Sequence, residues 1–225
     1  EHQVLIGEEQ LFHFVGELFQ YAGMPREDAL MHARALVDTD LWGISSHGVM
    51  RVPAYFTRML NGAIRVRPQI HKAAGDGALE VLDGDAGAGI VVGCRAMDRA
   101  IELAKTHHIA AVGVRNSNHF GAGAIYARMA AERGMIGIAM TNVKPLVTAP
   151  GAVRPVVGNN PLAIAIPTYG EFPFCLDMAL SKVAGGKLTL AIKRGEKIPM
   201  DWATDADGRP TDDPGKAFNG YLLPM

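Results

Sequence analysis

Apolar residues recur in the first part of the chain with the three-to-four-residue spacing of an amphipathic helix. These stripes predict helices over residues 8–22 and 50–61. Between them, Pro25 as a helix start and the acidic pair Glu27-Asp28 in the first turn predict a helix over residues 25–41. Gly23 is expected to end the first helix, because glycine readily takes the left-handed conformation of a helix C-cap. Residues 1–66 are therefore expected to form an N-terminal helical region.

After residue 66 short apolar runs alternate with helical stretches. The pattern predicts strands at 79–82, 110–115, 135–141, 162–166 and 172–176, and helices at 88–106, 122–133 and 179–194. Such alternation is typical of the α/β class, here a mixed α+β arrangement with a mixed sheet. Residues 67–225 are therefore expected to form an α/β domain, and the polar stretch 199–214 is expected to be a surface loop.

Composition and charge exclude several classes of partner. The formal net charge of -1 argues against nucleic acid or an anionic membrane, because both attract a basic surplus. No apolar run approaches the roughly 20 residues that a membrane span needs. Cys94 and Cys175 lie far apart in apolar runs, which argues against a disulfide framework and favours a cytoplasmic setting. No HExxH pattern is present, and no metal site is expected.

The stretch GISSHGVMR (43–51) concentrates polar side chains between two predicted helices. If a helix begins near Gly48, His47 and Arg51 share one face at spacing i, i+4. Arginine can hold a carboxylate by two parallel hydrogen bonds, and histidine can move a proton near neutral pH. Ser46 could cap the helix or bind a substrate oxygen.

Two other interpretations of this stretch stay open. A helix cap with exposed side chains explains the stretch when it is taken alone. A Ser/His hydrolase is disfavoured, because side chains adjacent in the chain rarely point at each other. A triad would also need an orienting partner for His47, and the sequence shows none.

A second polar cluster, NSNHFG (116–121), follows one predicted strand and precedes a helix. Ligands bind at strand ends in α/β sheets, so His119 is a second candidate for proton transfer. An Asx-turn that caps the next helix is the alternative. Further polar residues at later strand ends predict a cofactor groove, namely Thr141, Asn142, Lys144, Asn160 and the run Asp177-Met178-Ala179.

A glycine-rich turn, GDAGAG (84–89), follows a predicted strand and opens a helix, as a dinucleotide-binding turn would. Its spacing is GxxGxG, whereas the Rossmann fingerprint is GxGxxG. An ordinary Rossmann domain is therefore not expected.

Five stretches, taken together and in this order, resemble the type-2 malate/L-lactate dehydrogenase family. They are DTDLWGISSHGVMRVPAYFTRMLNGAI (38–64), NSNHFGAGAIYARMAAERGMIGIAMTN (116–142), VGNNPLAIAIP (157–167), CLDMALSKVAGGK (175–187) and RGEKIPMDWATDADGRPTDDP (194–214). The resemblance implies oxidoreduction between a small 2-oxo acid and its 2-hydroxy acid, with NAD or NADP as the cofactor. It also implies a non-Rossmann α/β fold and a homodimer.

The resemblance assigns roles to the polar clusters by position. His47 matches a proton donor proposed for some members, and His119 matches an acid/base proposed for others, so the choice between them stays open. Ser46 is expected to position His47 or a substrate oxygen, while Arg51 and Lys144 are expected to contact the substrate. The remaining strand-end residues are assigned to the cofactor, namely Thr141, Asn142, Asn160, Asp177, Met178 and Ala179.

Some family features are missing, and some alternatives stay open. The family continues past LLPM with a glycine-rich segment and helices that this chain lacks, so a truncated protein is expected. The same fold could reduce a cyclic imino acid, or could serve as a non-catalytic binding protein. The substrate, the choice of NAD or NADP and the oligomeric state are not decided by the sequence.

Overall fold

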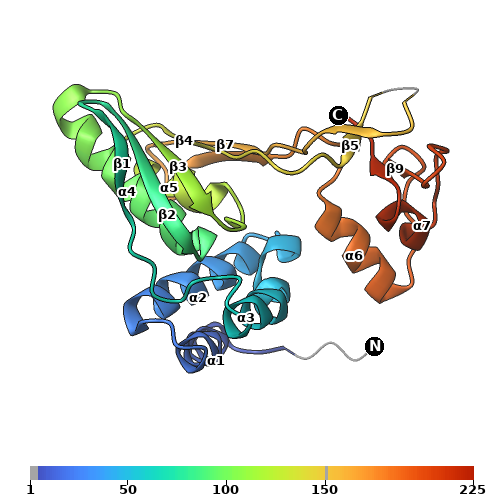
Figure 1. The fold of residues 1–225 in the computed structure, drawn as a ribbon, viewed down its shortest axis with the longest axis horizontal. Coiled ribbons are helices and arrows are strands. Elements are labelled where there is room, and N and C mark those ends of the chain that lie inside the picture. The colour runs from blue at the N-terminus through green and yellow to red at the C-terminus, as the bar shows by residue number, and fades with distance from the viewer. Residues whose placement is uncertain (1–4, 150–151) are drawn as a thin grey trace.

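The computed structural model describes residues 5–149 and 152–225, and Figure 1 shows their arrangement. Three helices come first: α1 (Glu8–Tyr21), α2 (Arg26–Leu41) and α3 (Val52–Leu60). They confirm the three helices predicted for this region. Residues 1–4 of the predicted helical region lie outside the described residues.

The link between α2 and α3 differs from the predicted helix start. It consists of two short 3₁₀ turns, η1 (Ser45–His47) and η2 (Val49–Arg51), separated by Gly48 with ψ of -147°. The α-helix begins only at Val52. The expectation that His47 and Arg51 share one helix face is therefore wrong, because the extended backbone at Gly48 interrupts the helical path.

The first sheet has the strand order β1-β2-β3, with β1 (His71–Asp76), β2 (Leu79–Gly87) and β3 (Ala111–Ser117). β1 pairs antiparallel with β2, whereas β2 pairs parallel with β3. Helix α4 (Gly89–His107), which the sequence predicted, connects β2 to β3. Figure 1 shows this sheet and α4 above the N-terminal helices. The sequence missed β1, because an edge strand exposed along nearly its whole length has no apolar alternation to reveal it.

The second sheet is antiparallel, with the order β4-β7-β8. Its strands are β4 (Gly137–Met140), β7 (Leu162–Ile166) and β8 (Phe174–Met178), and helix α5 (Ala124–Ala131) covers one face. Buried alanines form that contact, since Ala127 and Ala131 of the helix pack against Ala163 and Ala165 of β7. Small side chains let the helix lie close to the sheet.

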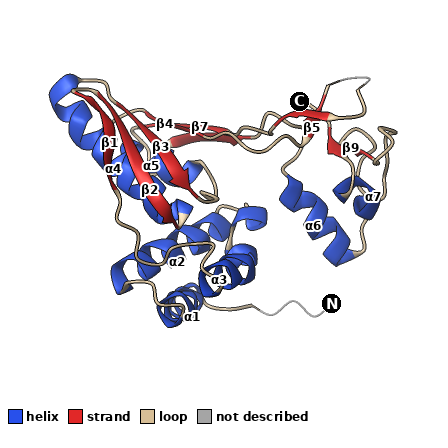
Figure 2. Ribbon diagram, in the orientation of Figure 1, coloured by secondary structure: helices blue, strands red, loops and turns tan. Residues whose placement is uncertain are grey.

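The third sheet has the order β6-β5-β10-β9 and belongs to the C-terminal part, which lies at one end of the molecule in Figures 1 and 2. Its elements are β5 (Val147–Thr148), β6 (Pro155–Val157), β9 (Ala203–Thr204) and β10 (Tyr221–Leu222), with helices α6 (Gly185–Arg194) and α7 (Pro214–Phe218). A separate apolar cluster holds this part together, centred on Val147, Leu188, Ile198 and Leu222. These short strands and α7 were not predicted.

Two predictions for this part need correction. The helix expected from residue 179 begins at Gly185, because the preceding residues bond to distant backbone instead. Leu180 donates its N–H to the Asn159 carbonyl at 2.7 Å, and Lys182 donates to Leu223 at 2.9 Å. The stretch 199–214 is only partly a surface loop, because Ala203, Thr204 and Thr211 are buried.

The mixture of helices with three small sheets confirms the mixed α/β class. Parallel pairing within the described residues is confined to β2 with β3 and to β5 with β10, apart from one isolated bridge. This is not the doubly wound parallel sheet of a Rossmann domain, in agreement with the glycine spacing. One apolar core joins α1–α3 to α4 and α5, so the division at residue 66 stays a prediction.

Candidate active site

The turn that carries Ser46 and His47 is held by a carboxylate from the preceding helix. Asp40 Oδ2 accepts a hydrogen bond of 2.8 Å from the Val49 N–H. A Cβ atom at Gly48 would overlap the Asp40 carboxyl group, so a larger residue there would displace the carboxylate that holds the turn. Sequence reasoning missed Asp40, although a carboxylate at the end of a helix, where the dipole disfavours it, was a usable signal.

Ser46 and His47 do contact each other, contrary to the argument from their adjacency. The Ser46 Oγ atom lies 2.9 Å from His47 Nδ1. The tight 3₁₀ turn brings these neighbouring side chains together. Ser46 itself is buried, so its hydroxyl is available mainly to the imidazole.

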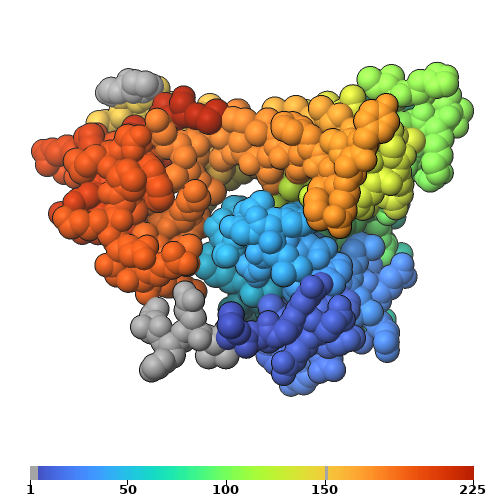
Figure 3. Space-filling view, turned by 180° about the vertical axis from the view of Figure 1, so that it is seen from behind, coloured from blue at the N-terminus to red at the C-terminus, as the bar shows by residue number. Residues whose placement is uncertain are grey.

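Arg51 is fixed beside the same turn. Its Nε–H donates to the Ser46 carbonyl at 2.7 Å. A Cβ atom at Gly186, in the first turn of α6, would lie 2.8 Å from Arg51 Nη2 and 2.9 Å from Ser46 Cβ. Figure 3 shows the C-terminal part in orange beside the light-blue segment that carries these turns. The two parts of the chain therefore meet at Arg51.

The glycines of the GDAGAG turn hold the second polar cluster close to α4. A Cβ atom at Gly89 would overlap the carbonyl oxygens of Asn118 and His119. A Cβ atom at Gly84 would lie 3.0 Å from the Asn116 carbonyl oxygen. These glycines therefore admit the backbone of the His119 loop.

Asn118 ties the His119 loop to two other elements. Its Nδ2 donates to the Ala86 carbonyl at 2.8 Å and to the Gly87 carbonyl at 3.0 Å. Its Oδ1 accepts from Arg58 Nη2 of α3 at 2.7 Å. The loop is thus anchored to β2 and to α3, in addition to its own strand.

The structure brings the two candidate histidines together. The rings of His47 and His119 are stacked, with centroids 5.6 Å apart and planes inclined by 20°. His119 Nδ1 lies 2.6 Å from the Tyr55 hydroxyl and accepts from the Gly121 N–H at 3.2 Å. Tyr55 belongs to the apolar stripe that predicts a helix over 50–61, and the sequence did not single it out as a site residue.

Both histidines have a depressed pKa. Burial, then the charge of Arg51 and then His119, lower the pKa of His47 to about 3. Desolvation by the surrounding protein atoms, then the charges of Arg51 and Arg58, lower the pKa of His119 to about 4. Part of the His119 side chain is nevertheless exposed to solvent. Both rings are therefore neutral at neutral pH, and the permanently charged groups that lower their pKa are the guanidinium groups of Arg51 and Arg58. Such a site favours an anionic ligand.

The strand-end residues gather at one end of the second sheet. Met140 of β4, Leu162 of β7 and Met178 of β8 stand in one cross-strand register. The residues next to them therefore lie at the same edge: Thr141, Asn142, Asn160, Asp177 and Ala179. Asn160 Oδ1 accepts from the Val143 N–H at 3.0 Å, which fixes the turn between β4 and β5.

This sheet edge is linked to the His119 loop by Asp177. Its Oδ2 accepts from the Ala124 N–H at 2.8 Å, at the start of the helix that follows the loop. Lys144 is exposed beyond the same edge.

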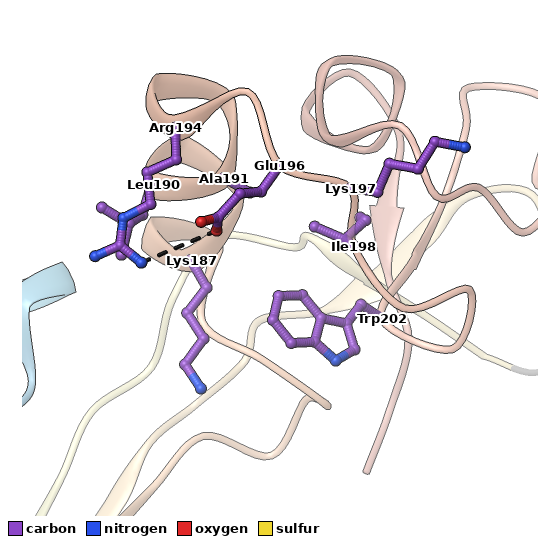
Figure 4. A pocket seen from close by; sticks show the side chains of 8 residues that line it. All are labelled: Lys187, Leu190, Ala191, Arg194, Glu196, Lys197, Ile198 and Trp202. Carbon is purple, nitrogen blue, oxygen red and sulfur yellow. Dashed lines mark ion pairs between the residues drawn. The ribbon is translucent and has the colours of Figure 1, made fainter. Parts of the chain in front are cut away.

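A pocket of about 240 Å³ lies on α6 and the loop that follows it, and Figure 4 shows its side chains. Arg194 and Glu196 form an ion pair of 3.9 Å there, and Lys187 Nζ lies 5.7 Å from the Trp202 ring centre. None of the site residues predicted from the sequence lines this pocket.

Three further observations concern the described part of the chain. Cys94 and Cys175 are free thiols. No group of three or more His, Cys, Asp or Glu side chains in that part could hold a metal ion. No helix there has the length and apolar character to cross a lipid bilayer.

Comparison with known proteins gives consistent matches. A family model described as malate/L-lactate dehydrogenase matches residues 6–225. The malate dehydrogenase of Pyrococcus abyssi is 46% identical over 226 residues, which cover 100% of this chain and 62% of that protein. The chain spans about three fifths of the length of the curated relatives that it matches first.

Solved structures share the fold. A malate dehydrogenase from Entamoeba histolytica superposes with a TM-score of 0.95 and 33% identity, covering 99% of this chain and 64% of that one. A delta1-piperideine-2-carboxylate reductase from Pseudomonas syringae superposes with a TM-score of 0.91 and 27% identity, covering 99% of this chain and 68% of that one.

Proposed function

Because the chain belongs to the malate/L-lactate dehydrogenase family, we propose that the protein containing it interconverts a small 2-oxo acid and its 2-hydroxy acid with NAD or NADP. One observation supports this most directly. Two neutral histidines, from segments far apart in the sequence, are stacked 5.6 Å apart beside a fixed arginine. In that arrangement the arginine can bind a substrate carboxylate, and a histidine can exchange a proton with the substrate oxygen next to it.

Arg51 is the proposed carboxylate group. Its Nε is engaged by the Ser46 carbonyl, which orients the guanidinium. Arginine binds carboxylates by charge-assisted hydrogen bonds, and it thereby determines which substrate carbon faces the reacting position. Lys144 is proposed as a second substrate contact, and its side chain is exposed to solvent.

The histidine pair is the proposed acid/base, with Ser46 positioning His47 through the 2.9 Å contact. In the reductive direction the substrate oxygen gains negative charge and takes a proton from the ring that becomes protonated when the substrate carboxylate binds beside Arg51. Positioned proton transfer of this kind is worth about 10²–10⁴-fold in rate. A bound substrate carboxylate offsets the charge of Arg51, which is a cause of the low pKa of both rings.

The edge of the second sheet is the proposed cofactor site. Its hydroxyl and amide side chains, with backbone groups at the strand ends, suit the polar groups of a nicotinamide dinucleotide. The proposed contacts are Thr141, Asn142, Asn160, Asp177, Met178 and Ala179. A nicotinamide cofactor, when bound, supplies or accepts the hydride.

Reduction of a cyclic imino acid is the second candidate. The likeness to the delta1-piperideine-2-carboxylate reductase favours it, because the same carboxylate site and proton donor would serve a C=N bond. We also propose, from family membership, a cytoplasmic homodimer. Sedimentation at several concentrations tests the dimer, and a single monomer mass throughout would contradict it.

The decisive experiment is a screen of NADH and NADPH oxidation by the complete protein, with 2-oxo acids and cyclic imino acids as substrates. Oxidation with a 2-oxo acid supports the proposal, and oxidation with imino acids alone supports the second candidate. No oxidation with either class would favour a non-catalytic binding protein. With an active substrate, the variants His119→Ala and His47→Ala then identify the acid. It is the histidine whose replacement abolishes turnover, whereas replacement of the other mainly weakens substrate binding.

A further inference from the structure

His119 Nδ1 has two neighbours that can donate hydrogen bonds. The Gly121 N–H donates to it at 3.2 Å, and the Tyr55 hydroxyl lies 2.6 Å from it. An amide N–H cannot accept a hydrogen bond, so Nδ1 must present its lone pair to Gly121. In a neutral imidazole the proton then lies on Nε2.

Tyr55 is well placed to support the same state. Its side chain is buried, and its ring lies 5.3 Å from the His32 ring, which stacks on Phe19 at 4.5 Å. Burial raises the pKa of Tyr55 to about 12, while Arg51 and Arg58 oppose that rise. The phenol therefore stays protonated and can donate to an unprotonated Nδ1.

The arrangement around His47 is different. Its Nδ1 meets the Ser46 hydroxyl at 2.9 Å, and a hydroxyl can donate or accept. Ser46 therefore does not select one tautomer of His47. The two stacked rings are thus held in unequal ways.

We propose that Tyr55 is a positioning residue which, together with the Gly121 N–H, keeps the proton of His119 on Nε2, so that His119 offers an N–H to the substrate. This inference rests on the proposed function for its catalytic meaning. A fixed N–H matches the carbonyl oxygen of a 2-oxo acid, which is an acceptor. The proton of neutral His47 can instead lie on either ring nitrogen, because Ser46 selects neither tautomer.

The test is nitrogen NMR of the histidines in the complete protein, with His119→Gln used to assign the signals. In the unsubstituted protein, His119 Nδ1 is expected to be unprotonated and Nε2 protonated. Tyr55→Phe keeps the ring but removes one donor, so the two nitrogen shifts should move toward each other. Tyr21→Phe, which removes an exposed hydroxyl on α1, is the matched control and should leave them unchanged.

Kinetics give the second readout. Tyr55→Phe should lower kcat about tenfold, as loss of one hydrogen bond to a reacting group predicts, with KM changed less than about twofold because Arg51 is intact. A protonated Nδ1 in the unsubstituted protein, or unchanged shifts in Tyr55→Phe, would overturn the inference. The NMR result needs no turnover, so a failed substrate screen would refute the proposed function and leave the tautomer assignment standing.

Discussion

Asp177 accepts a hydrogen bond of 2.8 Å from the N–H of Ala124, and so caps the helix that begins directly after the His119 loop. The two residues lie on different elements, β8 and α5. The proposed cofactor edge and the proposed acid/base loop are therefore mechanically joined by one carboxylate. A residue assigned by resemblance to the cofactor also has a structural role.

Removal of this carboxylate should destabilise the fold. Asp177→Ala is expected to lower the free energy of unfolding by about 0.5–2 kcal/mol, the usual cost of losing a helix N-cap. Asp177→Asn keeps an acceptor oxygen and should cost less. Urea denaturation measures both, with Asp207→Ala, at an exposed aspartate, as the control. Equal stability of all three variants would contradict the capping role.

Gly89 should be essential for the position of His119. In Gly89→Ala the new Cβ would overlap the carbonyls of Asn118 and His119, and overpacking of this kind costs about 1–3 kcal/mol. The loop must shift, so kcat should fall while the variant still folds. Thermal unfolding and turnover measure the two effects. Gly185→Ala has open space around its Cβ and should leave both unchanged, so equal behaviour of the two variants would contradict this account.

The contacts of Gly84 and Gly89 show which features could be predicted from the sequence and which could not. The GxxGxG spacing argued against an ordinary Rossmann domain, and the sheet topology agrees. The role of Gly84 and Gly89 depends on a loop about thirty residues further along the chain, and no local pattern reports that contact. In the same way, the apolar stripe predicted α3, but it could not show that Tyr55 reaches His119, 64 positions away.

The elements themselves were predictable where a periodic pattern existed. α1 and α4 have long amphipathic stripes, and β7 is a continuous apolar run with turns at both ends. α2 was predicted instead from Pro25 and the acidic residues of its first turn. β5, β9 and β10 have only two residues each, and their pairing is set by partners distant in sequence. Single-sequence periodicity does not detect elements of that length.

Substitution of Arg51 should weaken substrate binding and change the pH response. Arg51→Gln removes a charged partner of the carboxylate, so kcat/KM should fall about 10- to 100-fold, as charge-assisted hydrogen bonds of about 1.5–3 kcal/mol predict. It also removes a charge that lowers the pKa of His47 and His119, so both should titrate at higher pH. Arg209→Gln, at an exposed arginine, is the kinetic and NMR control. An unchanged kcat/KM would exclude Arg51 as the carboxylate group.

His32 should make the fold sensitive to acid. Burial lowers its pKa from 6.5 to about 3, so the unfolded chain binds a proton more readily than the folded protein. The stability that the neutral, buried His32 gives the fold is fully present above about pH 6.5. As the pH falls from there toward 3, the free energy of unfolding decreases by an amount on the order of a few kcal/mol.

The matching variant is His32→Phe, which keeps an aromatic ring against Phe19. It removes two buried nitrogens that have no hydrogen-bond partner among the residues that the structure describes. Its stability should fall less between pH 6.5 and 4 than that of the unsubstituted protein. His13→Gln, at an exposed histidine, is the control. Parallel curves of unfolding free energy against pH would show that His32 does not carry the effect.

Binding of a 2-oxo acid should draw a proton into the site. Both histidines are neutral in the free protein, because their pKa values lie at about 3 and about 4. Ser46, Tyr55 and the Gly121 N–H contact the two rings, and Arg51 and Arg58 are the charged groups that lower their pKa. A carboxylate placed on Arg51 offsets its charge, so the pKa of the histidine pair must rise on binding. The complex then holds more protons than the free protein at intermediate pH, and affinity falls as pH rises from about 4 toward the pKa of the complex.

Calorimetry in buffers of different ionisation heat measures this uptake directly, with the substrate added and the cofactor omitted so that no turnover occurs. The expected value is a positive fraction of one proton near neutral pH, because two stacked rings beside Arg51 do not readily hold two charges. His13→Gln should give the same uptake, since that residue is exposed on α1, whereas His47→Asn should reduce it. Binding without any uptake in the unsubstituted protein would mean that the substrate carboxylate does not sit on Arg51 beside the two rings, and the proposed site geometry would have to be abandoned.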